Sequence, residues 1–253
     1  MYVRYVAIGD SQTEGVGDGD DRRGLRGWAD RLAEKLAGLD PDFRYANLAV
    51  RGRLIGEVRA QQLGPALELE PDLVTVVAGL NDVLSSQYDA DAVAAHLEEM
   101  VSALREAGAH VATVTYPDIG EIAPMARARQ PRLTEFNARI REIAAKHGAA
   151  VVEADQHPVC ADRRIWSGDR LHLNPAGHAL LADGFGHALG LPGADESWSD
   201  PLPPLPAPGP VRTVVAELRW AAVFLAPWLW RRITGRSSGD GRIAKRASLQ
   251  KIS

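Results

Sequence analysis

Ser11 is the first residue of this chain whose type and position could do chemistry. The tripeptide Gly9-Asp10-Ser11 follows the apolar run at residues 2–8, which is typical of a buried β-strand that ends in a glycine turn. A serine just past a strand end, among small residues, can be presented as a nucleophile. The same tripeptide also forms ordinary turns, because glycine tolerates positive φ and Asp and Ser bond nearby amides. The nucleophile interpretation therefore requires a base, an orienting group and oxyanion donors elsewhere in the chain.

Oxyanion donors can come from two other loops that follow predicted strands. Gly52 lies in the loop at residues 51–53, and Asn81 lies in the loop at residues 79–82. Because the carboxyl ends of parallel strands meet at one edge of a sheet, both loops should lie beside Ser11. A hydroxyl, a glycine amide open to close approach and a carboxamide donor are what acyl transfer requires.

Asp169 and His172 supply the matching acid and base. They are three residues apart, after the fifth predicted strand and just before a helix that begins near Asn174. On a tight turn the carboxylate can approach one ring nitrogen of His172, which leaves the other nitrogen to face Ser11. The order Ser…Asp…His with only two residues between the last two differs from other hydrolase triads, and the chain has no Gly-x-Ser-x-Gly elbow.

The elements that must position these residues alternate along the chain. Short β-branched strands are expected at residues 2–8, 43–50, 73–78, 111–116 and 149–153. Helical periodicity covers residues 28–39, 54–63, 91–107, 133–147 and 174–189, the last with Asn174 as N-cap and Pro175 in the first turn. This alternation predicts an α/β fold, a five-stranded parallel sheet with helices on both faces.

Composition limits the possible partners. The 253 residues carry a net charge of −4, but residues 211–253 hold nine Lys and Arg against Glu217 and Asp240, which leaves the rest of the chain strongly acidic. An acidic body argues against nucleic-acid binding, whereas a basic tail favours an anionic partner. The single cysteine, Cys160, excludes an internal disulfide and a multi-thiolate metal site. We expect packing or surface roles for the six other histidines.

Four blocks in register resemble the SGNH (GDSL-type) hydrolase superfamily over residues 1–190: Gly9-Asp10-Ser11, Gly52, Gly79-Leu80-Asn81-Asp82 and Asp169-Arg170-Leu171-His172. The resemblance implies a three-layer, flavodoxin-like α/β/α sandwich. It also implies that Ser11 is the nucleophile, His172 the general base and Asp169 the group that orients His172. The oxyanion hole would consist of Ser11 N–H, Gly52 N–H and the Asn81 side chain. This family often has leucine after the nucleophile, where this chain has Gln12, a change that can alter the nearby pocket.

The expected function is hydrolysis of a small-molecule carboxylic ester through an acyl-enzyme on Ser11. Short-chain acyl, lysophospholipid-like and acetylated-sugar esters are all compatible with the motifs. The mechanism needs no cofactor and no metal ion. The alternative is a non-catalytic, membrane-associated binding protein on an SGNH scaffold. A missing triad or oxyanion residue would be the mark of that alternative, and none is missing.

The predicted organisation is a hydrolase domain at residues 1–191, a Pro-rich linker at 192–210, an apolar, Trp-rich amphipathic helix at 211–233 and a basic, disordered tail at 234–253. The uninterrupted apolar core at 220–230 is too short to span a bilayer, which needs about twenty residues. Residues 211–246 therefore either bind an anionic membrane surface or dock on protein, with neither alternative favoured. Without a secretory signal, we expect a cytoplasmic location, peripheral at the inner face of the membrane if the tail binds lipid. The oligomeric state is left open.

Overall fold

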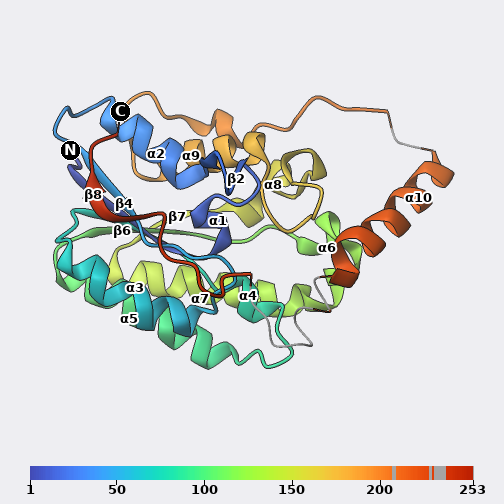
Figure 1. Cartoon of the computed structure of the whole chain (residues 1–253), viewed down its shortest axis with the longest axis horizontal. Coiled ribbons are helices and arrows are strands. Elements are labelled where there is room, and N and C mark those ends of the chain that lie inside the picture. The colour runs from blue at the N-terminus through green and yellow to red at the C-terminus, as the bar shows by residue number, and fades with distance from the viewer. Residues whose placement is uncertain (207–208, 228–229, 231–237, 253) are drawn as a thin grey trace.

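A six-stranded sheet forms the centre of the computed structural model, which describes residues 1–206, 209–227, 230 and 238–252 (Figure 1). Five strands are parallel, and a sixth, from the C-terminal segment, is antiparallel. The order across the sheet is β7-β6-β5-β1-β4-β8. The strands are β1 (Arg4–Gly9), β4 (Arg44–Asn47), β5 (Leu73–Val77), β6 (His110–Val114), β7 (Ala150–Val152) and β8 (Arg246–Gln250).

The five parallel strands confirm the predicted fold class. Their order in space is that of a flavodoxin-like sheet, in which β1 lies between β4 and β5 and the winding direction changes beside β1. All five residues of β5 are buried, as are the last five of β1, because helices cover both faces of the sheet. The loops after β1, β4 and β5 leave the sheet at one edge, next to the point where a ligand binds in such folds.

Two layers of helices enclose the sheet, with α2 and α9 on one face and α3, α5 and α7 on the other (Figure 1). Trp28 of α2 stacks on Phe185 of α9 with ring centroids 4.3 Å apart, which joins the two helices of the first layer. These helices are α2 (Trp28–Ala37), α3 (Ile55–Glu68), α5 (Ala90–Glu106), α7 (Gln130–His147) and α9 (Pro175–Ala188).

Helix boundaries differ from the predicted ones where proline is involved. Helix α3 continues through Pro65 to Glu68, although the Gly-Pro pair predicts an end near residue 63. Helix α7 begins at Gln130, three residues before the predicted start, with Pro131 in its first turn. Proline is accepted there because an N–H group in the first turn has no carbonyl partner within the helix. The start of α9 is as predicted, because the Asn174 side chain accepts hydrogen bonds from the amides of Ala176 and Gly177.

Several short elements lie in regions expected to be loops. Helical turns α1 (Ser11–Glu14) and α4 (Leu80–Val83) directly follow β1 and β5. Both carry residues singled out above as candidates for the site, so those side chains lie in helical turns instead of open loops. The others are β2 (Gly19–Asp20), β3 (Gly24–Leu25), α6 (Ile119–Ile122), η1 (Pro124–Arg129), η2 (Ala154–Gln156), α8 (Pro158–Ala161) and η3 (Arg163–Ile165).

The prediction of a disordered tail at residues 234–253 is wrong for its final part. Residues 246–250 form β8, which pairs with β4 in the register Tyr45↔Gln250 and Asn47↔Arg246. Three tail cations form ion pairs with the acidic body: Arg242 with Asp21 (2.6 Å), Lys245 with Asp30 (2.5 Å) and Lys251 with Asp42 (3.3 Å). Part of the positive charge of the tail is therefore paired with acidic residues of the same chain.

The linker and the Trp-rich segment are described only in part. Within the linker, residues Glu196–Ser199 form a 3₁₀ turn whose Trp198 is buried against Gly184. Helix α10 (Pro210–Trp220) continues as the π-helical turn Ala221–Leu225, whereas residues 228–229 and 231–233 of the predicted helix lie outside the described residues. In the part of the chain that the structure covers, no helix is both long enough and apolar enough to cross a membrane.

Candidate active site

Ser11, His172 and Asp169 form a continuous hydrogen-bonded chain at the carboxyl edge of the sheet. His172 Nε2 lies 2.9 Å from Ser11 Oγ, and His172 Nδ1 lies 2.7 Å from Asp169 Oδ2. With the Nδ1 proton donated to the carboxylate, Nε2 can accept the proton of the Ser11 hydroxyl. The fold thus brings together three groups that are up to 161 residues apart in the sequence.

Asp169 is held in one orientation by the backbone that follows it. Its Oδ1 accepts hydrogen bonds from the amides of Leu171 and His172, both at 3.0 Å, which leaves Oδ2 for the imidazole. Burial alone would raise the pKa of the Asp169 carboxyl. The hydrogen bond and charge of His172, together with the two amides, outweigh burial and hold this pKa below its ordinary value. Asp169 therefore stays ionised throughout the neutral range.

Asp10 starts the helical turn that carries Ser11. Its Oδ1 accepts from Gln12 N–H at 3.3 Å as the N-cap of α1. Complete burial raises the pKa of the Asp10 carboxyl to about 7, and the hydrogen bond from Gln12 offsets only part of this. Because Ser11 is the first residue of the turn, its amide has no carbonyl partner within α1.

Gly9 fixes the path of the chain into this turn. Its φ is +154°, and a Cβ atom here would lie 2.2 Å from the carbonyl oxygen of Val77 on the neighbouring strand. Gln62, on α3, donates to Gly9 O at 2.9 Å and accepts from Gly9 N–H at 2.8 Å. The end of β1 is therefore fixed both by a steric requirement for glycine and by a buried side chain that no local motif indicates.

Asn81 lies in α4 and faces Asp10. Its Nδ2 donates to Asp10 Oδ2 at 3.2 Å and to Arg53 O at 3.1 Å. Both distances are at the long end for N–H···O hydrogen bonds. A substrate oxygen that accepts from Asn81 would therefore replace one of these contacts. The amide lies between the loop after β4 and the loop after β1.

Gly52, the third predicted oxyanion donor, lies in a turn that a buried ion pair holds in place. Its φ is +76°, a left-handed conformation that favours glycine. The preceding Arg51 donates two guanidinium nitrogens and its backbone amide to the Glu14 carboxylate at 2.6–3.0 Å. The same guanidinium also contacts Asp21, which binds Arg242 from the tail. The Gly52 turn is thus tied to the end of α1, the helical turn that begins with Ser11.

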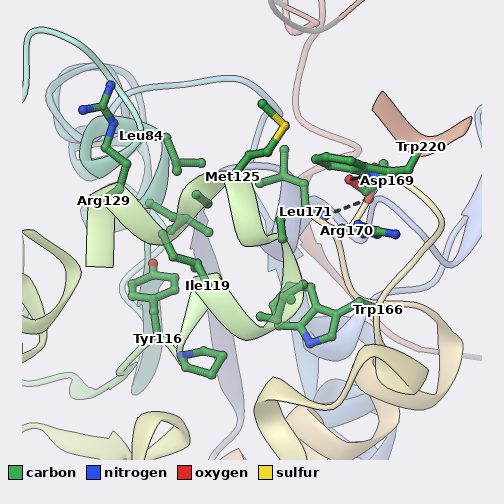
Figure 2. A pocket seen from close by; sticks show the side chains of 15 residues that line it. Leu84, Tyr116, Ile119, Met125, Arg129, Trp166, Asp169, Arg170, Leu171 and Trp220 are labelled. Carbon is green, nitrogen blue, oxygen red and sulfur yellow. Dashed lines mark hydrogen bonds between the residues drawn. The ribbon is translucent and has the colours of Figure 1, made fainter. Parts of the chain in front are cut away.

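An apolar cavity of about 260 Å³ lies beside Asp169, the carboxylate that contacts His172 (Figure 2). Asp169 lines it, as do Leu80 and Leu171, the residues that precede Asn81 and His172. Ser11 and His172 themselves lie beside the cavity and are not part of its wall. The rest of the wall is mainly apolar and includes Tyr116, Ile119, Met125, Trp166 and Trp220.

Comparison with known proteins decides the family. Residues 7–180, well over half of the chain, match the GDSL-like lipase/acylhydrolase family. The chain belongs to this family. It is therefore a carboxylic ester hydrolase, as the four sequence blocks predict. Among curated proteins, no relative matches the chain.

Solved structures with the same fold include several esterases. An acetylxylan esterase from Geobacillus stearothermophilus, Axe2, is 19% identical with a TM-score of 0.64, and the match covers 77% of this chain and 97% of that one. The acetyl xylan esterase AlAXEase is 22% identical (TM-score 0.61; 74% and 100% covered), and TesA is 23% identical (0.61; 74% and 97%). At these identities the likeness shows a common fold.

Gln12 departs from the leucine that is frequent after the nucleophile in GDSL-type proteins, and the structure shows what it contacts. The side chain is buried; its Nε2 donates to Leu171 O at 2.8 Å, and its Oε1 accepts from Leu173 N–H at 3.3 Å. The amide thus binds the backbone immediately before and after His172. The sequence indicates only an altered pocket here, because the partners are backbone atoms about 160 residues away.

We expect the substitution Gln12→Leu to slow this acylhydrolase by lowering kcat more than it raises KM. Both backbone partners would lose a hydrogen bond in a buried site, at a cost of about 1–3 kcal/mol, and His172 would be held less well. We expect kcat to fall about 10-fold. Steady-state kinetics on a soluble ester would measure this, with Gln87→Leu on an exposed loop as the matched control. A stability loss without any change in kcat would show that Gln12 supports the loop and not the chemistry.

His178 is the other histidine of this GDSL-type site that has a defined structural role. It is fully buried; its Nδ1 accepts from Trp28 N–H at 3.1 Å, and its Nε2 donates to Val16 O at 3.1 Å. Burial lowers the pKa of the imidazole to about 4, so the ring stays neutral. It joins α9 to the loop that follows Ser11. Across the described ranges, no three His, Cys, Asp or Glu side chains converge as metal ligands.

Proposed function

We propose that this member of the GDSL-like family is a serine esterase that forms an acyl-enzyme on Ser11 and prefers esters of aliphatic acids. The observation that supports it most is the chain of contacts Ser11–His172–Asp169, with distances of 2.9 and 2.7 Å. This arrangement contains a nucleophile, a base within reach of its proton and a carboxylate that orients the base.

In the proposed mechanism, Ser11 Oγ attacks the ester carbonyl carbon while His172 Nε2 takes the hydroxyl proton. The amides of Ser11 and Gly52 and the Asn81 side chain donate to the oxygen that becomes negative. The intermediate then breaks the bond to the alcohol, which leaves with the proton from His172. Water attacks the acyl-enzyme in the same way: His172 takes its proton, the carboxylic acid is released, and Ser11 regains its hydrogen.

The cavity favours an aliphatic acyl group over an acetylated sugar. Its wall is mainly apolar and offers few groups that could bind sugar hydroxyls. A cavity of about 150 Å³ holds benzene, so about 260 Å³ suits an acyl chain of roughly six to ten carbons. Lysophospholipid-like and short- to medium-chain acyl esters fit this description, whereas the acetylxylan esterases among the solved structures share only the fold.

An activity profile combined with active-site labelling tests the proposal. We expect p-nitrophenyl esters to be hydrolysed with an optimum at medium acyl length and less rapidly as acetate. A fluorophosphonate should add once per chain, and mass spectrometry of peptides should locate it on Ser11. Labelling at another serine, or hydrolysis that is unaffected by complete labelling of Ser11, would contradict the proposed mechanism.

The proposed binding of residues 211–246 to an anionic membrane surface stays a prediction. The contacts of the described residues limit which side chains could take part in it. Val214, Val215 and Leu218 on α10 are all more than half exposed and form an apolar face. Arg242 and Lys245, by contrast, are engaged by Asp21 and Asp30 of the body. Lipid binding would therefore depend on the exposed face of α10 and not on the charges of the final segment.

A further inference from the structure

The segment that follows the family-matched region contacts three consecutive residues of the loop that carries Asp169. Trp220 Nε1 donates to Asp169 O at 3.1 Å. Glu217, one turn earlier on α10, accepts from both terminal nitrogens of Arg170 at 2.5 and 3.0 Å. Phe224 lies beside Gly168, where a Cβ atom would stand 3.4 Å from its ring. Helix α10 is thus docked on this loop, near α6 (Figure 1).

Charged contacts hold the helix in this position. Glu217 also pairs with Arg163 at 2.8 Å, so one carboxylate joins two arginines of the body. Arg170 has a φ of +58°, and its guanidinium lies 4.6 Å from the centre of the Trp220 ring. A cation over an indole ring is a favourable arrangement, and only 12% of the Arg170 side chain is exposed. The docking therefore uses specific ion-pair and ring contacts, with Arg170 and Trp220 the most buried of the partners.

Trp220 is also part of the wall of the apolar cavity. Figure 2 shows its ring beside Asp169 and Arg170, across from Ile119 and Met125 of the α6–η1 region. The side chain is 9% exposed, although most neighbouring large apolar residues of the helix are far more exposed. The indole therefore forms part of the cavity wall next to Asp169.

We propose that Trp220 is a specificity-determining residue, which closes the acyl cavity and selects aliphatic acyl chains of medium length. The inference rests on the proposed function, because it assigns the cavity to the acyl group of the ester. Trp220 lies outside residues 7–180, so the family match says nothing about it. Glu217 is the positioning residue that keeps the indole in place through Arg163 and Arg170.

The test compares kcat/KM for octanoyl and acetyl p-nitrophenyl esters in the full-length chain. Trp220→Ala removes the wall, and we expect the octanoyl-to-acetyl ratio to fall about 10-fold. Glu217→Gln, which leaves the indole but weakens its anchor, should lower the ratio in the same direction. Trp220→Phe keeps an apolar ring without the hydrogen bond to Asp169 O and should keep a ratio near that of the wild type. Val223→Ala, at a side chain that is 53% exposed one turn further along the helical segment, is the matched control.

The outcomes separate this inference from the proposed function. A reduced ratio in Trp220→Ala and Glu217→Gln, with an unchanged ratio in Val223→Ala, supports the specificity role. Equal losses on both esters would show a merely structural role and overturn the inference, as would an unchanged ratio in a folded Trp220→Ala protein. In either case Ser11-dependent hydrolysis by the wild type would keep the proposed function intact. Absence of any Ser11-dependent hydrolysis would overturn both.

Discussion

Replacing Ser11 with alanine is expected to lower kcat on a soluble ester by about 10⁴- to 10⁶-fold and to abolish labelling by a fluorophosphonate. The hydroxyl is the one group 2.9 Å from His172 Nε2 in position to attack, so its removal leaves the base without a nucleophile to activate. The residual rate would come from binding and oxyanion donors alone. Steady-state kinetics with the purified variant on a soluble ester would measure the loss of kcat.

Two comparisons make the result specific. Ser102→Ala, at a half-buried serine on α5 whose hydroxyl donates to Glu106, should retain full activity and labelling. The double variant of Ser11→Ala and His172→Ala should be about as slow as either single variant, because the two side chains act as one unit. Independent, additive losses would contradict the assignment of His172 as the base for Ser11. Thermal unfolding of all variants would show that the fold persists.

Much of the fold follows from local sequence patterns because its strands are short, apolar and regularly separated by helices. The five parallel strands and the five large helices occur where periodicity places them, although boundaries shift at Pro65 and Pro131. Strand β8 could not be predicted in this way. Its sequence, Arg-Ala-Ser-Leu-Gln, has no β-branched residue, and the contacts that order it are non-local. It pairs with the edge strand β4, and the preceding Arg242 and Lys245 bind Asp21 and Asp30.

The candidate site was predictable as far as it depends on strand ends. Ser11, Asn81 and the Asp169–His172 pair lie close together because parallel strands share a carboxyl edge and because each block follows one of those strands. The residues that hold them were not predictable. Gln12 and Gln62 bind backbone atoms of distant segments. Trp220, which follows the linker in the sequence, binds the backbone of Asp169. No spacing in the sequence indicates these contacts.

Replacing Asp169 with asparagine is expected to lower kcat by about 10³- to 10⁴-fold while leaving the loop folded. The reason lies in the two oxygens of the carboxylate. Oδ1 accepts from the amides of Leu171 and His172, so the carbonyl oxygen of an asparagine would take that place. Its NH₂ group would then face His172 Nδ1 and donate to it. The imidazole proton would move to Nε2, which could no longer accept the proton of Ser11.

The predicted tautomer change has a direct spectroscopic signature. Nitrogen-15 NMR of the His172 ring should show the proton on Nδ1 in the wild type and on Nε2 in Asp169→Asn at neutral pH. Asp162→Asn, the same change seven residues upstream in a pair with Arg164, should leave both the tautomer and kcat within about twofold of the wild type. A slow Asp169→Asn protein whose His172 tautomer is unchanged would mean that the carboxylate acts through its charge on the imidazolium. The low pKa of Asp169 would then matter more than the direction of its hydrogen bond.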